Sequence, residues 1–150
     1  MDKVIFALAT FAFGYFVALH DCKAQELYTI ATVKSYHQDR SAGYNEKNMG
    51  IGLELHLNSD WKTIVGEYKN SFTHKSIYYG VAWMPFHRGD VSAGLLAVNV
   101  SGYLQPLSKY AFGAIPIVEW KLQQVLLNVV FIPPIRNEGL IACQIGWRFY

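Results

Sequence analysis

The sequence predicts an all-β protein, an eight-stranded antiparallel transmembrane β-barrel preceded by a cleaved signal peptide. Three observations lead to this fold class: an export signal at the N-terminus, apolar and polar residues that alternate along β-rich segments, and tryptophans that recur near the ends of those segments. A closed barrel satisfies every backbone polar group in lipid, and each of its strands must present an apolar face to the bilayer.

The N-terminus carries the export signal. Lys3 is followed by a long apolar run, and the small residues Cys22 and Ala24 suit cleavage after Ala24. A basic start, an apolar core and a small-residue cleavage site are typical of a secretory signal peptide. We therefore expect residues 1–24 to be removed and residues 25–150 to form one outer-membrane barrel. An uncleaved membrane anchor and a lipoprotein signal that uses Cys22 are the alternatives.

Composition and charge exclude several classes of function. The formal net charge is only +2, and no basic run or stacking motif indicates nucleic-acid binding. Only Cys143 follows the signal, so no disulfide framework is expected. The mature part has no apolar run of about 20 residues and therefore no predicted transmembrane helix. No metal-ligand spacing or phosphate-binding loop stands out, and we expect neither a metal nor a cofactor.

Turn signals divide the mature chain into segments long enough for tilted membrane strands of about 9 to 11 residues. The eight predicted strands are residues 27–37, 49–57, 61–70, 75–85, 91–103, 110–120, 123–132 and 140–150. An even number of strands places both termini on one side, which we expect to be the periplasm. The connections at 58–60, 86–90 and 120–121 are then periplasmic turns, and they are short, as bacterial barrels prefer.

Four tryptophans support this orientation. Trp61, Trp83, Trp120 and Trp147 all fall near strand ends on the predicted periplasmic side. Aromatic residues are common in β-structure generally, but aromatic girdles also mark the membrane interfaces of barrels. The grouping of the tryptophans at one end favours a girdle.

The polar residues of the strands decide which face points inward. A lipocalin-like soluble barrel, the all-β alternative, has an apolar interior. Ionisable groups in a dry core would be prohibitive unless they paired. Facing lipid, each Arg or Lys near the midplane would cost about 2 to 4 kcal/mol. We therefore predict a polar lumen that holds an interior network of Glu54, His56, Glu67, Lys69 and Arg148.

Reactive side chains gather at the predicted outer rim. The first strand ends at His37, the third ends next to Asn70 and Ser71, and His74 precedes the fourth. A histidine beside a serine can act as general base and nucleophile in acyl transfer. Turn serines and loop-edge histidines are also ordinary polar surface residues, so the residues alone leave both interpretations open.

Several short stretches resemble the outer-membrane lipid A palmitoyltransferases (PagP). The likeness spans nearly all of the mature chain. The stretches that carry it are Leu27-Tyr28 with His37 near the strand end, Tyr44-Asn45-Glu46-Lys47-Asn48-Met49-Gly50-Ile51-Gly52, Tyr68-Lys69-Asn70-Ser71-Phe72, Ile115-Pro116, Phe131-Ile132-Pro133 and Trp147-Arg148-Phe149.

The resemblance implies an enzyme that moves a palmitoyl chain from a phospholipid onto lipid A. By this likeness His37 matches the family's catalytic histidine and Ser71 its catalytic serine. Asn70 stands where the family has Asp, so it can assist by hydrogen bonding but not by charge. The implied partners are membrane lipids, with a phospholipid as donor and lipid A as acceptor, in the outer membrane of a bacterial cell.

Prolines and the C-terminus add two further expectations. Pro116, Pro133 and Pro134 resemble strand-edge prolines of that family, which lack an N–H donor and can open a lateral gate to lipid. Phe149-Tyr150 resembles the C-terminal signal that outer-membrane assembly machinery recognises. We expect a monomer.

A second hypothesis is a non-catalytic small outer-membrane barrel with a structural, lipid-binding or surface-interaction role. It is motivated by Asn70, which stands where the family has Asp, and by the short loops. An interior filled by side chains, with no room for an acyl chain, would support it.

Overall fold

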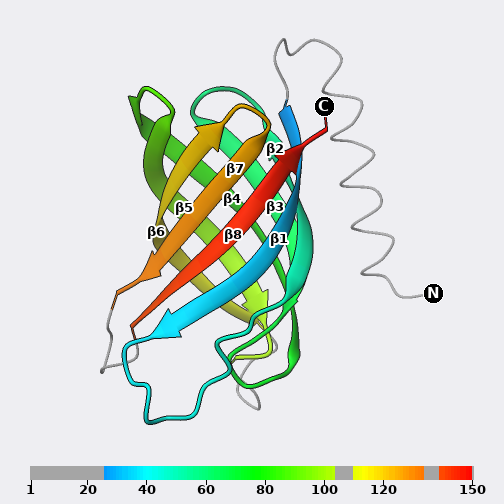
Figure 1. Cartoon of the computed structure of the whole chain (residues 1–150), viewed down its shortest axis with the longest axis vertical. Coiled ribbons are helices and arrows are strands. Elements are labelled where there is room, and N and C mark those ends of the chain that lie inside the picture. The colour runs from blue at the N-terminus through cyan, green and yellow to red at the C-terminus, as the bar shows by residue number, and fades with distance from the viewer. Residues whose placement is uncertain (1–25, 104–109, 134–138, 150) are drawn as a thin grey trace, which may run out of the picture.

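The computed structural model describes residues 26–103, 110–133 and 139–149 and arranges them as a closed barrel (Figure 1). Neighbouring strands pair antiparallel in sequence order, and the last strand closes the barrel against the first. The strands are β1 (Glu26–His37), β2 (Gly50–His56), β3 (Trp61–Lys69), β4 (Lys75–Arg88), β5 (Val91–Ser101), β6 (Tyr110–Leu122), β7 (Val125–Ile132) and β8 (Leu140–Arg148). The predicted eight-stranded antiparallel barrel is confirmed.

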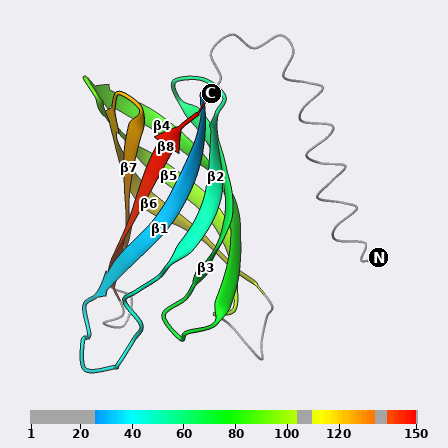
Figure 2. The ribbon, with the colours of Figure 1, turned by 45° about the vertical axis from the view of Figure 1, so that its right-hand side comes forward.

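The barrel has two different ends (Figures 1 and 2). The connections β2–β3, β4–β5 and β6–β7 are short and lie at what we call the turn end, where β1 begins and β8 finishes. The other connections are longer and lie at the loop end. The predicted signal peptide, residues 1–24, lies outside the described residues. In the part of the chain that the structure describes, no helix is long and apolar enough to cross a membrane.

Two turns at the turn end lie farther along the chain than the sequence predicts. The predicted loop 86–90 is wrong, because β4 continues to Arg88, which pairs with Val91 across a two-residue turn. Gly89 in that turn has φ of 59°, the left-handed conformation that such hairpin turns favour. Pro85 does not end the strand, because the register shifts between Trp83 and Phe86 and so accommodates a residue without an N–H donor.

The β6–β7 reversal is also misplaced in the prediction at 120–121. β6 continues to Leu122, which pairs with Val125, so the turn consists of Gln123 and Gln124. Gln123 takes the left-handed φ of 57° that this tight turn needs. The sequence offers no glycine or asparagine there, so the usual turn signal is absent.

The outer face of the barrel is apolar over most of its height. Large exposed side chains include Leu53, Val65, Val81, Leu95 and Ile145. The four tryptophans point outward at the turn end; Trp61 and Trp83 are cross-strand partners, and their rings stack with centroids 6.3 Å apart. An apolar wall of this kind is stable against hydrocarbon and not against water, so the barrel is a transmembrane one.

The middle of the lumen is filled by packed side chains. Ile64, Tyr78, Met84, Leu96 and Ile117 form the main buried apolar cluster, and Tyr28, Ile30 and Leu126 form a smaller one. This apolar packing adjoins a charged cluster near the turn end, because Ile64 is the cross-strand partner of Glu54. A polar site lies at the loop end.

Candidate functional site

His37 and Ser71 meet at the loop end. Their side chains form a hydrogen bond with 2.8 Å between Nε2 and Oγ, and both residues are buried. His37 is the last residue of β1 and Ser71 follows β3 in the connection to β4, so the barrel brings together residues from two different strand ends. A neutral imidazole nitrogen at this distance can accept the hydroxyl proton of a serine nucleophile.

A β-bulge turns His37 into the lumen. Along β1, Tyr28, Ile30 and Thr32 point inward, but past the bulge the inward residues are Ser35 and His37. The register against β8 shifts between Thr32 and Lys34, and Val33 is the extra residue. Because side chains alternate with period two, one inserted residue exchanges the two faces for the rest of the strand.

The connection between β1 and β2 closes over this pair. Tyr44 packs on the imidazole of His37 with ring centroids 4.7 Å apart, and Phe72 meets Tyr44 edge-on. Asn45 Nδ2 donates to the carbonyl of Asn70 at 3.0 Å, and Asn48 Nδ2 donates to the carbonyl of Lys69 at 3.0 Å. These amides fix the loop to the end of β3, so the His–Ser pair lies beneath an ordered cover.

Asn70 makes no hydrogen bond to His37 among the described residues. Its Oδ1 accepts the backbone N–H groups of Phe72 and His74, and its Nδ2 donates to the hydroxyl of Ser76 at 2.9 Å. The residue is fully buried and shapes the turn that presents Ser71. It therefore sets the position of the serine backbone, and its assisting role in catalysis stays a prediction.

The carboxylate nearest to His37 belongs to Glu46, which sequence reasoning did not select. Glu46 Oε1 accepts a long hydrogen bond of 3.4 Å from the His37 backbone N–H, and Arg40 pairs with Oε2. Loss of solvent contact raises the pKa of Glu46, but the His37 N–H and the Arg40 charge outweigh this effect and lower the pKa overall. His37 Nδ1 is buried and has no hydrogen-bond partner among the described residues.

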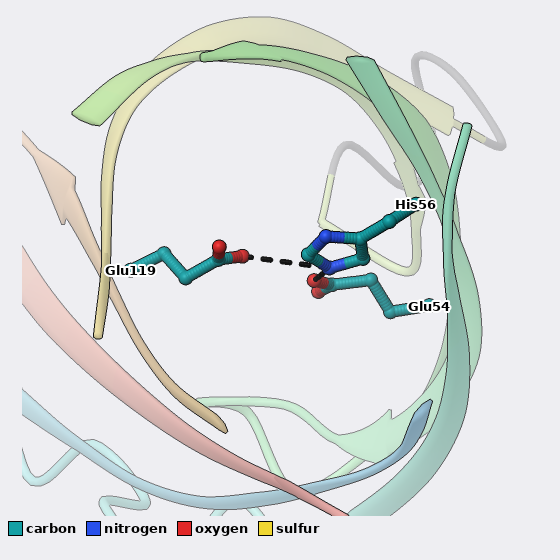
Figure 3. Close-up of side chains that lie close together, drawn as sticks. All are labelled: Glu54, His56 and Glu119. Atoms are coloured by element: carbon teal, nitrogen blue, oxygen red, sulfur yellow. Dashed lines mark hydrogen bonds and ion pairs between the residues drawn. The ribbon is translucent and has the colours of Figure 1, made fainter. Parts of the chain in front are cut away.

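A second polar cluster fills the lumen near the turn end (Figure 3). Lys62 lies at its centre and donates through Nζ to Glu54 at 3.0 Å, to Asn128 at 3.2 Å and to Glu119. His56 Nε2 lies 2.6 Å from Glu54 and 3.5 Å from Glu119. Glu54 and His56 extend from β2 toward Glu119 on the opposite wall. These charged groups are almost fully buried, so their mutual pairing is what makes burial tolerable.

Glu26 continues the cluster to the barrel mouth. Its carboxylate accepts hydrogen bonds from Arg148 and from Lys121, the latter at 2.9 Å, and from the hydroxyl of Tyr28 at 3.1 Å. Three carboxylates thus face three cations: Glu26, Glu54 and Glu119 against Lys62, Lys121 and Arg148. Of the predicted network residues, Glu54, His56 and Arg148 lie here.

The predicted inward placement of Glu67 and Lys69 is wrong. Both point outward near the loop end, where Glu67 pairs with Lys75 at 2.6 Å. Residues of β3 alternate, and Lys62, Ile64 and Tyr68 take the inward positions. Trp61 has the same parity as Glu67, so a tryptophan assigned to the outer girdle already implied an outward Glu67 and an inward Lys62.

Three of the lumen side chains also have the spacing of metal ligands. Ligand atoms of Glu54, His56 and Glu119 lie within 4.8 Å of one another. However, the ammonium of Lys62 contacts both carboxylates and provides the positive charge at that position. The donor set is therefore satisfied by the protein's own cation, and it does not fit a resident metal.

Two of the predicted gate prolines, Pro116 and Pro133, lie in β6 and directly after β7, which are neighbouring strands. The β6–β7 ladder runs from Leu122–Val125 to Ile117–Val130 and ends there, next to Pro116, while β6 continues to the loop end. Pro116 is exposed on the outer face and pairs with Leu95 of β5. Pro133 follows β7 and is exposed, and Pro134 lies outside the described residues.

The lumen is unevenly filled around these strands. A Cβ added at Gly52 or Gly66 would meet the hydroxyl of Tyr78 at 2.4 or 2.5 Å, which shows tight packing across the middle. A Cβ added at Gly113 of β6 would meet no atom of the described residues within 4 Å. Gly113 alternates with the outward residues Phe112 and Ala114, so this space lies on the inner side of the β6 wall.

Comparisons with known proteins support the fold and nothing finer. No known protein family matches the chain, and no curated protein is significantly similar to it in sequence. The solution NMR structure of the de novo designed protein TMB2.3 is similar with a TM-score of 0.59 and 12% identity, over 84% of this chain and 94% of that one. The crystal structure of Ail, the attachment invasion locus protein of Yersinia pestis, matches with a TM-score of 0.41 and 13% identity, over 85% and 99%.

Proposed function

We propose that this protein is an outer-membrane acyltransferase that moves an acyl chain from a phospholipid to lipid A, with its loop end outward. The observation that carries the proposal is the 2.8 Å contact between His37 Nε2 and Ser71 Oγ. The likeness of short sequence stretches to lipid A palmitoyltransferases supports the choice of substrates.

The reaction follows from the two side chains. Ser71 Oγ attacks the ester carbonyl of the phospholipid, and His37 Nε2 accepts the hydroxyl proton. The ester C–O bond then breaks, and His37 returns the proton to the departing lysophospholipid alcohol, which leaves the acyl chain on Ser71. A hydroxyl of lipid A attacks this acyl-serine while His37 accepts its proton, and the serine recovers that proton as it leaves.

The β6–β7 side of the barrel would admit the acyl chain. The ladder stops at Ile117–Val130, next to a proline that lacks an N–H donor, so opening this seam breaks few hydrogen bonds. The space inside Gly113 borders the same seam. An acyl chain entering there would lie against the partly buried Ile115 and Val130.

Mass spectrometry of lipid A tests the proposal, with the chain expressed in a bacterial host that has an outer membrane and lacks its own palmitoyltransferase. Expression of this chain is expected to add one acyl chain when phospholipid reaches the outer leaflet. Ser71→Ala and His37→Ala should each reduce the product by at least about a hundredfold. Ser41→Ala, in the exposed part of the β1–β2 connection, is the matched control and should leave the product unchanged.

Gly113→Met tests whether the acyl chain occupies the space inside β6. The new side chain enters open space, so the variant should fold normally. It is expected to exclude long acyl chains while barrels still show heat-modifiable gel mobility. Unchanged lipid A with the unmodified chain would overturn the proposal.

The second candidate is a non-catalytic barrel that stabilises the membrane or binds lipid. It is favoured by the buried His37 Nδ1 without a partner and by the tightly packed middle of the lumen. Under this hypothesis the His–Ser contact only anchors the loop, so Ser71→Ala would lower stability without changing lipid A.

A further inference from the structure

An outward-facing hollow of about 470 Å³ lies at the loop end, beside the end of β3. Met49, Ile51, Glu67, Lys69 and Lys75 contribute to its lining. It is separate from the His–Ser pair, whose residues are inside the barrel. It is also unrelated to the lumen network near the turn end.

Two lysines face each other across this hollow. Lys69 and Lys75 are cross-strand partners in the β3–β4 ladder. Glu67 neutralises Lys75 at 2.6 Å, but Lys69 has no carboxylate partner among the residues that the structure describes. Like charges directly opposite each other are unfavourable in a sheet. An anion between the two ammonium groups would remove this repulsion.

The row directly below the lysines holds two isoleucines and Glu67, and the row below that one is apolar. The cross-strand row Met49, Lys69 and Lys75 is followed toward the turn end by Ile51, Glu67 and Ile77. Leu53, Val65 and Tyr79 form the next row, and all three are exposed on the outer face. The lysine row therefore marks the height where the lipid-facing wall meets the headgroup layer.

We propose that Lys69 and Lys75 bind the phosphate of an anionic lipid headgroup in the leaflet at the loop end. The phosphate lies between the two ammonium groups, and the acyl chains of the same lipid run down over Ile51 and Ile77. A lipid is the occupant because the hollow is continuous with the hydrocarbon-facing wall below it. The carboxylate of Glu67 weakens the attraction between the two lysines and the lipid phosphate, because it forms an ion pair with Lys75.

The test measures how many anionic lipids the purified barrel retains. The full chain is reconstituted in mixed phosphatidylcholine–phosphatidylglycerol nanodiscs, released into mild detergent and examined by native mass spectrometry. Lys69→Gln and Lys75→Gln are each expected to lower phosphatidylglycerol retention by about fivefold. Lys47→Gln, an exposed lysine of the β1–β2 loop, is the matched control and should retain as much as the unmodified chain. Glu67→Gln should retain more.

Three outcomes would overturn the site. Equal retention by the unmodified and doubly substituted chains would show that the lysines do not bind the lipid. An equal loss with Lys47→Gln would reduce the effect to overall charge. Displacement of the retained phosphatidylglycerol by millimolar inorganic phosphate would indicate a site for free phosphate. Ser71→Ala is expected to keep full retention, so a failure of the acyl-transfer proposal leaves this one standing.

Discussion

The carboxylate of Glu46 lies close to His37 and can stabilise a positive charge on its ring. Nδ1 has no hydrogen-bond partner among the residues that the structure describes, and the carboxylate of Glu46 contacts the backbone N–H of His37. When His37 takes up a proton, this carboxylate lies close enough to stabilise the positive ring through space. Under the proposed mechanism, a residue of the covering loop would therefore supply the negative charge that Asn70 lacks.

Glu46→Gln is expected to lower acyl transfer by about three- to tenfold, because the variant loses a negative charge near the ring that takes up the proton. The lowered pKa of Glu46 means that the carboxylate stays ionised down to pH values below the usual carboxyl range, and its contribution is lost as pH falls through that lowered pKa. Because His37 must be neutral to act as a base, both chains should show an acid limb in the pH–rate profile, and the variant should have the lower rate on the plateau above it. Asp39→Asn, whose partner is Ser41, is the control. Equal rates for Glu46→Gln and the unmodified chain would remove Glu46 from the mechanism.

Lys62 has the largest predicted effect on stability. Lys62→Met leaves Glu54 and Glu119 buried without their shared cation, which should cost about 3 to 5 kcal/mol. Urea unfolding in lipid vesicles measures the loss. Lys62→Met combined with Glu119→Met removes one charge of each sign and should recover much of it. If Lys62→Met alone were as stable as the unmodified chain, solvation by water rather than Lys62 would stabilise the two carboxylates.

At the scale of the strands, the β6–β7 turn is built at a cost. Gln123 has a positive φ, and the left-handed conformation costs a side-chain-bearing residue about 1 to 2 kcal/mol.

Gln123→Gly is therefore expected to stabilise the barrel by up to about 1 kcal/mol, after the entropy that glycine gains in the unfolded chain is subtracted. Gln124→Gly, one residue away at a position without positive φ, should lower stability instead. Unfolding in vesicles compares the two. If both variants changed the free energy of unfolding in the same direction, the result would contradict the turn geometry.

Strand positions were predictable from the sequence because apolar alternation and turn residues act locally. Errors occurred where a local signal was absent or ambiguous: Pro85 suggested a strand end, and Gln123-Gln124 carries no turn signature. The parity of β3 was readable from Trp61. The bulge at Val33 could not be predicted, because no residue type at this position indicates a bulge. It is seen only in the pairing of β1 with β8.

For the whole molecule, the tryptophans define a depth in the bilayer. Trp61, Trp83, Trp120 and Trp147 point outward at the same end, so they should lie together at one interface.

Tryptophan fluorescence in vesicles of brominated lipids measures this depth. Bromine near the headgroup should quench the emission more strongly than bromine near the chain end. Stronger quenching by the deep label, or complete quenching by an aqueous quencher, would mean that the turn end does not sit at an interface.

Long-range contacts limited what the sequence could say about the site. His37 and Ser71 were individually recognisable as reactive types, and closure of the barrel is what brings them within 2.8 Å. Glu119 and Asn128 were missed in the lumen because they lie on the far wall, and their link to Lys62 exists only once the sheet has closed.

The bulge in β1 makes strand pairing, shifted by a single residue, a determinant of chemistry. If the same residues formed a strand without the bulge, side chains would alternate strictly from Thr32, so the imidazole of His37 would project among the acyl chains of the bilayer and the phenol of Tyr36 would take its place above the lumen. Deleting Val33, in contrast, removes the extra residue itself and leaves His37 facing the lumen. Two barrels that differ only in whether this strand is bulged could thus share an architecture and the same reactive side chains while only one of them holds its histidine beside a serine.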